Sequence, residues 1–330
     1  HSFPTRRSSD LVLWPPPEAA AQCSLTCNDG LQVSLDATGQ AQITIPMISP
    51  TAPDNCPGAL QLKLFTPQGQ TIPNNILTCN HIGQTITAQV KHLASGNYCT
   101  GTLSVEDFLP PVITCTDKFV FCNHDASPAA VGFPIMSDNC TPANSLNFSY
   151  FDNVVSLPCG TLQNGQLVTK RIDRLWTVSD ANGNSNECQQ KIWLKHISIP
   201  NVTFPPSLDD ILHPALGCGQ DPADLALTGQ PTVEGVPIDN SPDCEFGVIY
   251  SDQIVPVCLP AGYNVIRTWT AVDFCTNQVT NRIQIIKVVD KTAPVLTPPA
   301  DLTVGTDGFL CTGTVQLPPA QTTDNCSAVT

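Results

Sequence analysis

The sequence has few charged residues, few aromatic residues and no long apolar run. Only 13% of its 330 residues are Asp, Glu, Lys or Arg, where about 25% is usual in soluble domains. Aromatic residues make up 6%, so each folded region can draw on only a modest apolar core. No apolar stretch approaches the ~20 residues of a membrane-spanning helix. We therefore expect no membrane insertion in this segment.

Motifs for catalysis and for zinc are also missing from the sequence. Neither G-x-S-x-G nor H-E-x-x-H occurs, and both would mark known hydrolase sites. The histidines do not recur in register between repeats, and beyond the first eleven residues they are His81, His92, His124, His196 and His213. With 14 basic and 28 acidic residues, the net charge of −14 disfavours nucleic acid and anionic membranes. We expect neither an enzyme nor a nucleic-acid partner.

Proline, glycine and cysteine are plentiful instead. The chain holds 31 Pro, 20 Gly and 16 Cys, and much of the rest is Thr, Val, Ile, Asn and Ser. This mixture favours short strands joined by turns. The cysteines are scattered rather than paired at zinc spacing, which suits disulfides formed in an oxidising compartment. The composition therefore predicts an all-β protein that is secreted or lies on the cell surface.

Internal repeats divide the chain. The pattern R-x-W-T-x-x-D occurs over 174–180 and again over 267–273. Upstream of each lies an Asp-containing Cys element, and this element recurs along the chain as Asp54-Asn55-Cys56, Asp138-Asn139-Cys140, Asp243-Cys244 and Asp324-Asn325-Cys326. Each pattern is followed by a Pro-bearing join. The spacing of about 90 residues matches an immunoglobulin-like β-sandwich, so the sequence predicts tandem sandwiches of this class.

These marks predict the following domain organisation. Residues 1–11 resemble a translated sequencing adapter, as in a metagenomic fragment, and are set aside as an artefact. The remainder is then divided into a linker (12–22), module 1 (23–111), module 2 (112–201), module 3 (202–294) and the truncated start of module 4 (295–330).

Alternating or β-branched runs predict individual strands. They lie at 43–45, 60–64, 85–90, 264–270 and 283–288. No convincing amphipathic helix is present, and residues 208–212 could form a single helical turn.

Comparison of the repeats predicts a disulfide framework. Module 3 has no cysteine at the positions that correspond to Cys115 and Cys188 of module 2. The loss of both together is expected if the two residues form a disulfide. The same reasoning and the recurrence of other cysteines give the pairs Cys140–Cys159, Cys244–Cys258, Cys218–Cys275, Cys56–Cys79 and Cys311–Cys326. Cys99 pairs with Cys27 or with Cys23, and Cys122 is left over. Each bond would stabilise a module by roughly 3 kcal/mol.

Modules 2 and 3 resemble the hyalin-repeat (HYR-like) modules of large Bacteroidetes surface proteins. The resemblance rests on the D-N-C element, R-x-W-T-x-x-D and D-x-T-A-P at 290–294. Module 1 resembles a companion repeat of the same proteins, through Cys27-Asn-Asp-Gly30 and Gly96-Asn97-Tyr98-Cys99. The resemblance implies an immunoglobulin-like fold, export by a type IX system and a role in adhesion or surface architecture. It implies no catalytic residues.

Two kinds of ligand site are considered. Asp180, Asn182 and Asn184 form part of an oxygen-rich loop that could hold calcium, and Asp107, Asp273 and Asp290 lie at joins or in loops. Turn chemistry also accounts for Asp, Asn and Gly at such positions. Trp176 and Trp269 could be platforms for sugars, but a core Trp beside a disulfide is commoner in such sandwiches.

The sequence as a whole predicts a non-catalytic repeat segment that acts as a disulfide-stapled stalk or adhesin. Its partners would be the other modules of the chain, and surface glycans or neighbouring cells. No cofactor is expected apart from calcium. The alternative is a carbohydrate- or calcium-binding accessory module of a larger extracellular enzyme.

Overall fold

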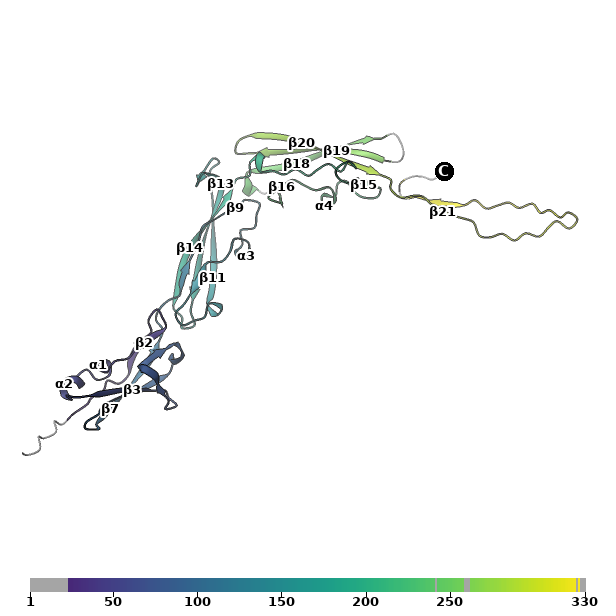
Figure 1. Ribbon diagram of the computed structural model, residues 1–330. Helices are drawn as coiled ribbons and strands as arrows, with labels where there is room; N and C mark the ends of the chain where they lie inside the picture. The colour runs from purple at the N-terminus through teal and green to yellow at the C-terminus, as the bar shows by residue number, and fades with distance from the viewer. Residues whose placement is uncertain (1–22, 241, 258–261, 325, 327–330) are drawn as a thin grey trace, which may run out of the picture. The chain divides into compact units, whose positions relative to one another are not determined.

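The computed structural model describes residues 23–240, 242–257, 262–324 and 326, which form an all-β fold of tandem β-sandwich type (Figure 1). The adapter-like segment and the predicted linker lie outside these residues. Two compact units are distinguished, each built from separate stretches of chain. Unit 1 contains residues 23–115, 134–150 and 175–188, and unit 2 contains residues 116–133, 151–174 and the described residues from 189 onward. The predicted module boundaries near 111, 201 and 294 stay predictions.

Unit 1 is built on a five-stranded sheet with the order β1-β7-β6-β3-β4. β1 pairs with β7 in parallel, and the other pairs are antiparallel. Its strands are β1 (Leu31–Ser34), β2 (Gln40–Gln42), β3 (Leu60–Phe65), β4 (Thr71–Ile72), β5 (Ile76–Thr78), β6 (Thr85–His92), β7 (Tyr98–Glu106), β8 (Val112–Thr114) and β10 (Ile135–Ser137). Its helices are short: α1 (Ile45–Ile48), α2 (Ala52–Asn55) and the 3₁₀ turns η1 (Pro73–Asn75), η2 (Cys79–His81) and η3 (Ala143–Ser145).

The core of unit 1 follows from alternation along β6 and β7. Every second residue of β6 from Ile86 onward is buried, and in β7 Leu103 and Val105 are buried. Side chains of a strand point to opposite faces in turn, so one face of the sheet is apolar. That face packs with Ile43 and Leu77, which flank or belong to the separate pair β2–β5. The result is a two-layered β-sandwich core.

Unit 2 is built on a four-stranded sheet with the order β15-β20-β19-β18. Its strands are β9 (Lys118–Phe121), β12 (Leu162–Gln163), β15 (Leu216–Gly217), β16 (Thr232–Val233), β17 (Val236–Pro237), β18 (Phe246–Pro256), β19 (Gly262–Asp273), β20 (Gln278–Val289), β21 (Val295–Thr297) and β22 (Gln321–Thr323). Its helices are α3 (Pro128–Val131), α4 (Leu225–Thr228), η4 (Ile199–Asn201) and η5 (Pro242–Cys244). Three further strands have residues in both units: β11 (Asn147–Ser156), β13 (Gln166–Ser179) and β14 (Ser185–Lys195).

The repeated R-x-W-T-x-x-D pattern lies at the ends of β13 and β19. In β19 every second residue from Val265 to Asp273 is buried, so Arg267, Trp269 and Asp273 share the core face. Arg267 donates to both carboxylate oxygens of Asp252 on β18, each at 2.8 Å. The guanidinium also lies 4.2 Å from the centre of the Tyr250 ring, a cation–π arrangement. The pattern therefore codes for a core strand with an internal ion pair.

The first copy of the pattern is built in the same way. Arg174 donates to Asp152 at 2.7 and 2.8 Å, and Tyr150 packs on Trp176 with ring centres 5.1 Å apart. A Y-x-D pattern on the partner strand accompanies each R-x-W, at 150–152 and 250–252.

Four of the five strand predictions coincide with strands, namely β3, β6, β19 and β20. The prediction at 43–45 is wrong, because β2 ends at Gln42 and α1 begins at Ile45. Pro46 lies in the first turn of α1, a place that suits proline because the first amides of a helix have no helical partner. Leu208 forms an isolated β-bridge with Ile286 and residues 209–212 form bends, so the predicted helical turn is wrong.

Candidate functional site: disulfide framework and acidic cluster

Seven disulfides join cysteines among the described residues. They are Cys23–Cys56, Cys27–Cys99, Cys79–Cys140, Cys115–Cys188, Cys122–Cys244, Cys159–Cys275 and Cys218–Cys326. The bonds Cys115–Cys188 and Cys27–Cys99 are pairs that the sequence suggested. Cys311 is exposed and carries no disulfide, and Cys258 lies outside the described residues.

Two predicted pairs that recur in both repeats are wrong. Cys140 is bonded to Cys79 and Cys159 is bonded to Cys275. The 10 residues of β11 lie between Cys140 and Cys159 in the sequence and span about 33 Å, whereas a disulfide requires Cα atoms within about 7 Å. Cys244 is bonded to Cys122, so it does not form the predicted bond with Cys258.

Three further predicted pairs are also wrong. Cys218 and Cys275 lie near opposite ends of β20, since β15 pairs with the end of β20 and Cys275 precedes its start. Cys56 and Cys79 bond to Cys23 and Cys140, and Cys326 bonds to Cys218 in place of Cys311.

Four of the seven disulfides join residues of different predicted modules. Cys79–Cys140 connects modules 1 and 2, two bonds connect modules 2 and 3, and Cys218–Cys326 connects module 3 to the start of module 4. Each of these four bonds lies inside one compact unit. Consecutive predicted modules are thus linked by sulfur as well as by peptide.

An acidic cluster in unit 1 is the main candidate for a ligand site. One carboxylate oxygen from each of Asp107, Asp138 and Asp180 lies within 4.8 Å of the others. Asp107 and Asp180 are each only 4% exposed. Among the described residues, no Lys, Arg or His forms an ion pair with any of the three. Buried charges usually pair with an opposite charge or bind a metal.

Strand geometry delivers two of these carboxylates. Asp107 follows β7 and continues its buried alternation after Leu103 and Val105. Asp180 follows β13 and continues the alternation of Trp176 and Val178. Both therefore point to the side of their strand that faces the core.

Asp138 is held by the turn that leads to Cys140. Its Oδ2 accepts hydrogen bonds from the backbone amides of Cys140 at 3.0 Å and Thr141 at 2.7 Å. Its Oδ1 is buried and has no hydrogen-bond partner, and the same holds for Oδ1 of Asn139. Asn139 donates through Nδ2 to Asp107 Oδ1 at 3.1 Å. Two orphaned oxygens thus belong to the residues of this cluster.

The predicted calcium ligands are brought together, but their roles differ. The side chain of Asn184 donates through Nδ2 to Asp180 Oδ2 at 2.7 Å and to the backbone oxygen of Asp107 at 2.9 Å. Asn182 Nδ2 lies 3.4 Å from Asp107 Oδ2. These amides orient the carboxylates as hydrogen-bond donors. The carboxylates themselves come from Asp107, Asp138 and Asp180, and the sequence prediction missed the role of Asp138.

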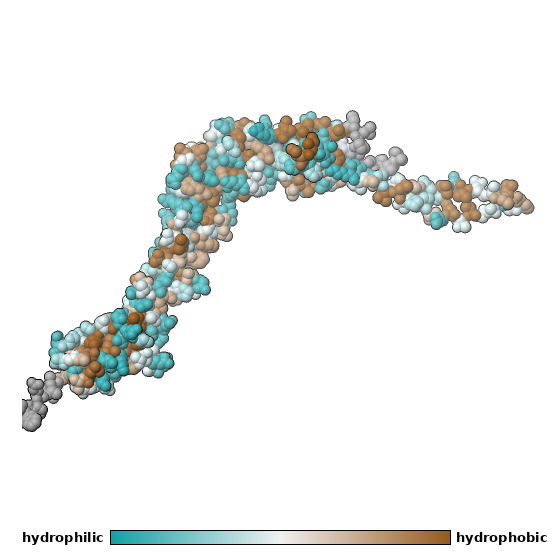
Figure 2. All heavy atoms as spheres, in the orientation of Figure 1, coloured by the Kyte–Doolittle hydropathy of each residue, from teal (hydrophilic) through white to brown (hydrophobic). Residues whose placement is uncertain are grey.

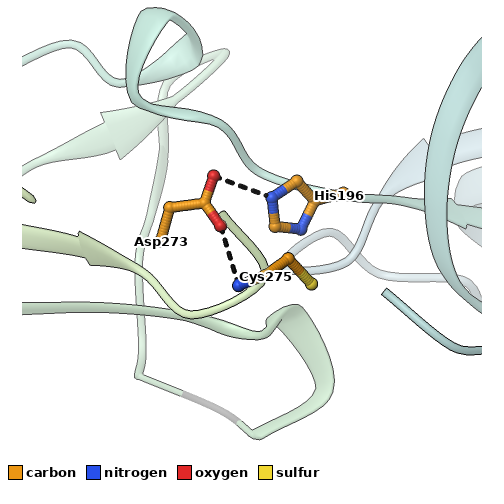
Figure 3. Close-up of side chains that lie close together, drawn as sticks. All are labelled: His196, Asp273 and Cys275. Atoms are coloured by element: carbon orange, nitrogen blue, oxygen red, sulfur yellow. Dashed lines mark hydrogen bonds and ion pairs between the residues drawn. The ribbon is translucent and has the colours of Figure 1, made fainter. Parts of the chain in front are cut away.

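A second group of possible ligand atoms lies in unit 2: His196, Asp273 and Cys275 (Figure 3). His196 Nε2 lies 3.1 Å from Asp273 Oδ2, and both side chains are buried. Burial raises the pKa of Asp273, but hydrogen bonds from His196 and Thr276 outweigh it and hold that pKa below its usual value. The sulfur of Cys275 is bonded to Cys159. It therefore cannot act as a thiolate nucleophile or metal ligand while the bond is intact.

The two tryptophans of the repeat are buried and cannot be sugar platforms in this structure. Trp176 is 0% and Trp269 is 3% exposed. Their ring faces are occupied by Tyr150 and Tyr250. Of the two interpretations of these residues, the structural one is therefore favoured.

Apolar surface is found on unit 2, where hydrophobic residues are visible around β18–β20 (Figure 2). A hollow of about 640 Å³ beside β18 and β19 is lined mainly by Phe246, Val248, Ile249, Val272 and Phe274. Its lining has little polar chemistry to orient a ligand. Among the described residues, no helix is long and apolar enough to cross a membrane.

Comparison with known proteins identifies no family for the chain. No family model and no curated protein matches the chain. Among solved structures, Drosophila N-cadherin EC1-4 is 10% identical, with 80% of this chain and 73% of that chain covered and a TM-score of 0.22. Human CDH23 EC21-23 is 11% identical, with 78% and 97% covered and a TM-score of 0.25. These values are too low to transfer any property of the cadherins to this chain.

Proposed function

We propose that the chain is a non-catalytic segment of a large secreted or cell-surface protein, in which it acts as a disulfide-stapled stalk or adhesive element. The observation that carries this proposal is the set of disulfides between predicted modules. Such bonds form and persist in oxidising, extracellular environments. They limit how far the chain can be extended. They also keep its parts connected when a peptide bond inside a disulfide loop is cleaved.

The aromatic-poor composition supports the same function. With 6% aromatic residues, each module has a modest core and gains much of its persistence from cross-links. The HYR-like resemblance, the Bacteroidetes surface setting and type IX export belong to this proposal. Other modules of the chain, surface glycans and neighbouring cells are the proposed partners.

Disulfide mapping tests the proposal. The chain is collected from an oxidising expression host, free thiols are alkylated, and peptides from a non-reducing digest are identified by mass spectrometry. We expect cross-linked peptides that join Cys79 to Cys140 and Cys122 to Cys244. Secreted protein with alkylated cysteines throughout would overturn the proposal.

Partial proteolysis tests whether the disulfides hold the chain together after cleavage. Because staples keep a cleaved module attached, the oxidised chain nicked by trypsin should run at full length without reductant and as fragments with it. Fragments in both lanes would show that the cross-links do not protect continuity. The exposed, unbonded Cys311 offers a control, since Cys311→Ser should change neither lane.

A further inference from the structure

We propose that Asp107, Asp138 and Asp180, together with Oδ1 of Asn139, bind one calcium ion. The inference rests on the proposed stalk function, because it assigns a ligand to one joint of the stalk. It differs from the sequence prediction in its ligands, since Asn182 and Asn184 serve to orient carboxylates.

Charge is the first argument. Three carboxylate oxygens lie within 4.8 Å of one another, and two of the side chains are 4% exposed. Like charges at this distance, shielded from water, repel strongly. A side-chain cation that would offset them is missing among the described residues. A bound divalent cation removes the repulsion.

The orphaned oxygens are the second, independent argument. Oδ1 of Asp138 and Oδ1 of Asn139 are buried and accept no hydrogen bond. A buried polar atom without a partner is costly. The Asn139 amide is located at the cluster by its hydrogen bond to Asp107. Both atoms are therefore available to a cation at this place.

The donor chemistry selects the ion. All the donors are oxygens, which suits hard cations and disfavours zinc or copper. The ligands come from the end of β7, from the turn before Cys140 and from the end of β13. Because these segments are separate, the backbone does not hold the ligands in a compact octahedral arrangement. Calcium accepts six to eight oxygens in flexible geometry, whereas magnesium demands a tight octahedron. Water would complete the shell of a calcium ion.

At the equivalent place in the next repeat, a histidine takes the position of one carboxylate. His196 lies four residues before Pro200, as Asp107 lies four residues before Pro111. Asp273 ends the second R-x-W-T-x-x-D pattern, where Asp180 ends the first. In unit 2 the imidazole of His196 lies against Asp273.

The acidic residue of the Cys element in the second repeat is also paired. Asp243 precedes Cys244 as Asn139 precedes Cys140, and it forms an ion pair with Lys170. A basic side chain thus lies against each of these carboxylates in unit 2, whereas among the described residues none pairs with the three carboxylates of the unit 1 cluster. The comparison indicates that the unit 1 cluster takes its positive charge from solution.

The test uses the full oxidised chain, stripped with EDTA and then titrated with CaCl₂ or MgCl₂ while unfolding is followed by differential scanning fluorimetry. Extracellular calcium modules bind with Kd of about 10⁻⁴–10⁻³ M. We expect a rise in Tm of about 3–6 °C at a tenfold excess over Kd, and a smaller rise with magnesium.

Two substitutions assign the response to the cluster. Asp138→Asn should abolish the calcium response while leaving the calcium-free Tm equal to or above that of the parent, because one repelling charge is removed. Asp107→His copies the arrangement of the second repeat and should also abolish it. Asp54→Asn, at an exposed aspartate of α2, should keep the full response and is the matched control.

Each outcome decides the inference. No calcium response in the parent chain, an equal response to magnesium, or a response that survives in both cluster variants would overturn it. Isothermal titration with calcium alone gives the stoichiometry, expected to be one for this cluster. Disulfide mapping is unaffected by any of these results, so failure of the calcium site and failure of the stalk proposal are distinguishable.

Discussion

The disulfide network sets a hard limit on how far the unfolded chain can be stretched. Between Cys23 and Cys326, the shortest covalent route crosses three disulfides, which are Cys27–Cys99, Cys115–Cys188 and Cys218–Cys326. Only three peptide segments then carry the load: 23–27, 99–115 and 188–218, together 50 residue steps. At up to about 3.6 Å per step, with the crossings included, this route is about 200 Å long.

Reduction releases the rest of the chain. The peptide route from Cys23 to Cys326 has 303 steps, or about 1,090 Å when extended. Pulling the full chain by its two ends in an atomic force microscope, with and without reductant, measures both contour lengths. The segments beyond these two cysteines add the same length to every version.

Paired substitutions separate the individual bonds. Without Cys218–Cys326, the shortest route changes to Cys23–Cys56, Cys79–Cys140 and Cys159–Cys275 and has 93 steps, about 350 Å. Cys218→Ala with Cys326→Ala should therefore add about 150 Å. Cys122→Ala with Cys244→Ala removes a bond that is off the route, so it should leave the length unchanged.

The measured contour length also distinguishes this disulfide network from one whose cross-links lie within single modules. The pairing suggested by the repeats gives a route of 86 steps through its own bonds, about 330 Å. An oxidised length near that value, or near the reduced one, would refute the reasoning. So would a Cys218/Cys326 variant that stretches no further than its parent.

Three substitutions test local features by chemical denaturation. Gly39→Ala should cost about 1–3 kcal/mol, because φ is +71° and a Cβ would lie 2.6 Å from a disulfide sulfur; Gly69→Ala, with φ +78° and open space, should cost less. His196→Ala leaves the carboxylate of Asp273 buried without its partner and should cost about 3 kcal/mol at pH 6. Because the pKa of Asp273 is lowered, its stabilisation holds above about pH 4 and is lost as the pH falls through the folded-state pKa, so the parent should lose more stability than the variant on acidification. Arg267→Met removes a fully buried guanidinium from its carboxylate and should lower stability by about 3 kcal/mol, whereas an unchanged denaturation midpoint would show that the pair is dispensable.

Period-two patterns made much of the fold predictable from the sequence. The alternation in β6, β19 and β20 is visible because one face is buried and the other is not. The strand expected at 43–45 failed because β-branched residues also occur where a proline starts a short helix. Local composition cannot decide between these two outcomes without the packing around them.

The cysteine pairing could be predicted only in part. Cys115 and Cys188 disappear together from the next repeat, and this covariation within the chain was a sound signal. Recurrence of a cysteine pair like Cys140 and Cys159 was not, because recurrence says nothing about whether an extended strand lies between the two residues. Counting strand residues between cysteines, at about 3.3 Å each, would have excluded that pair.

Only part of the acidic cluster could be predicted from the sequence. Asp107 and Asp180 were marked by their places at a join and a loop, yet Asp138 was read only as part of a repeated Cys element. Its role depends on a carboxylate oxygen left unpaired by the turn, which no sequence pattern records.

The repeated strand pattern unites the core and the joint. In R-x-W-T-x-x-D, the Trp lies two positions after the Arg, and the Asp lies four positions after the Trp. All three side chains therefore face the core. The Trp is buried within the strand, and the Asp is buried at the end of the strand. That carboxylate meets an imidazole in the second repeat and two further carboxylates in the first, through two differences in sequence. His196 takes the place of Asp107 in the preceding join, and Pro242 takes the place of Asp138 before the Cys. These positions lie outside the strands, so the chemistry at the end of the strand can change while the R-x-W-T-x-x-D pattern stays the same.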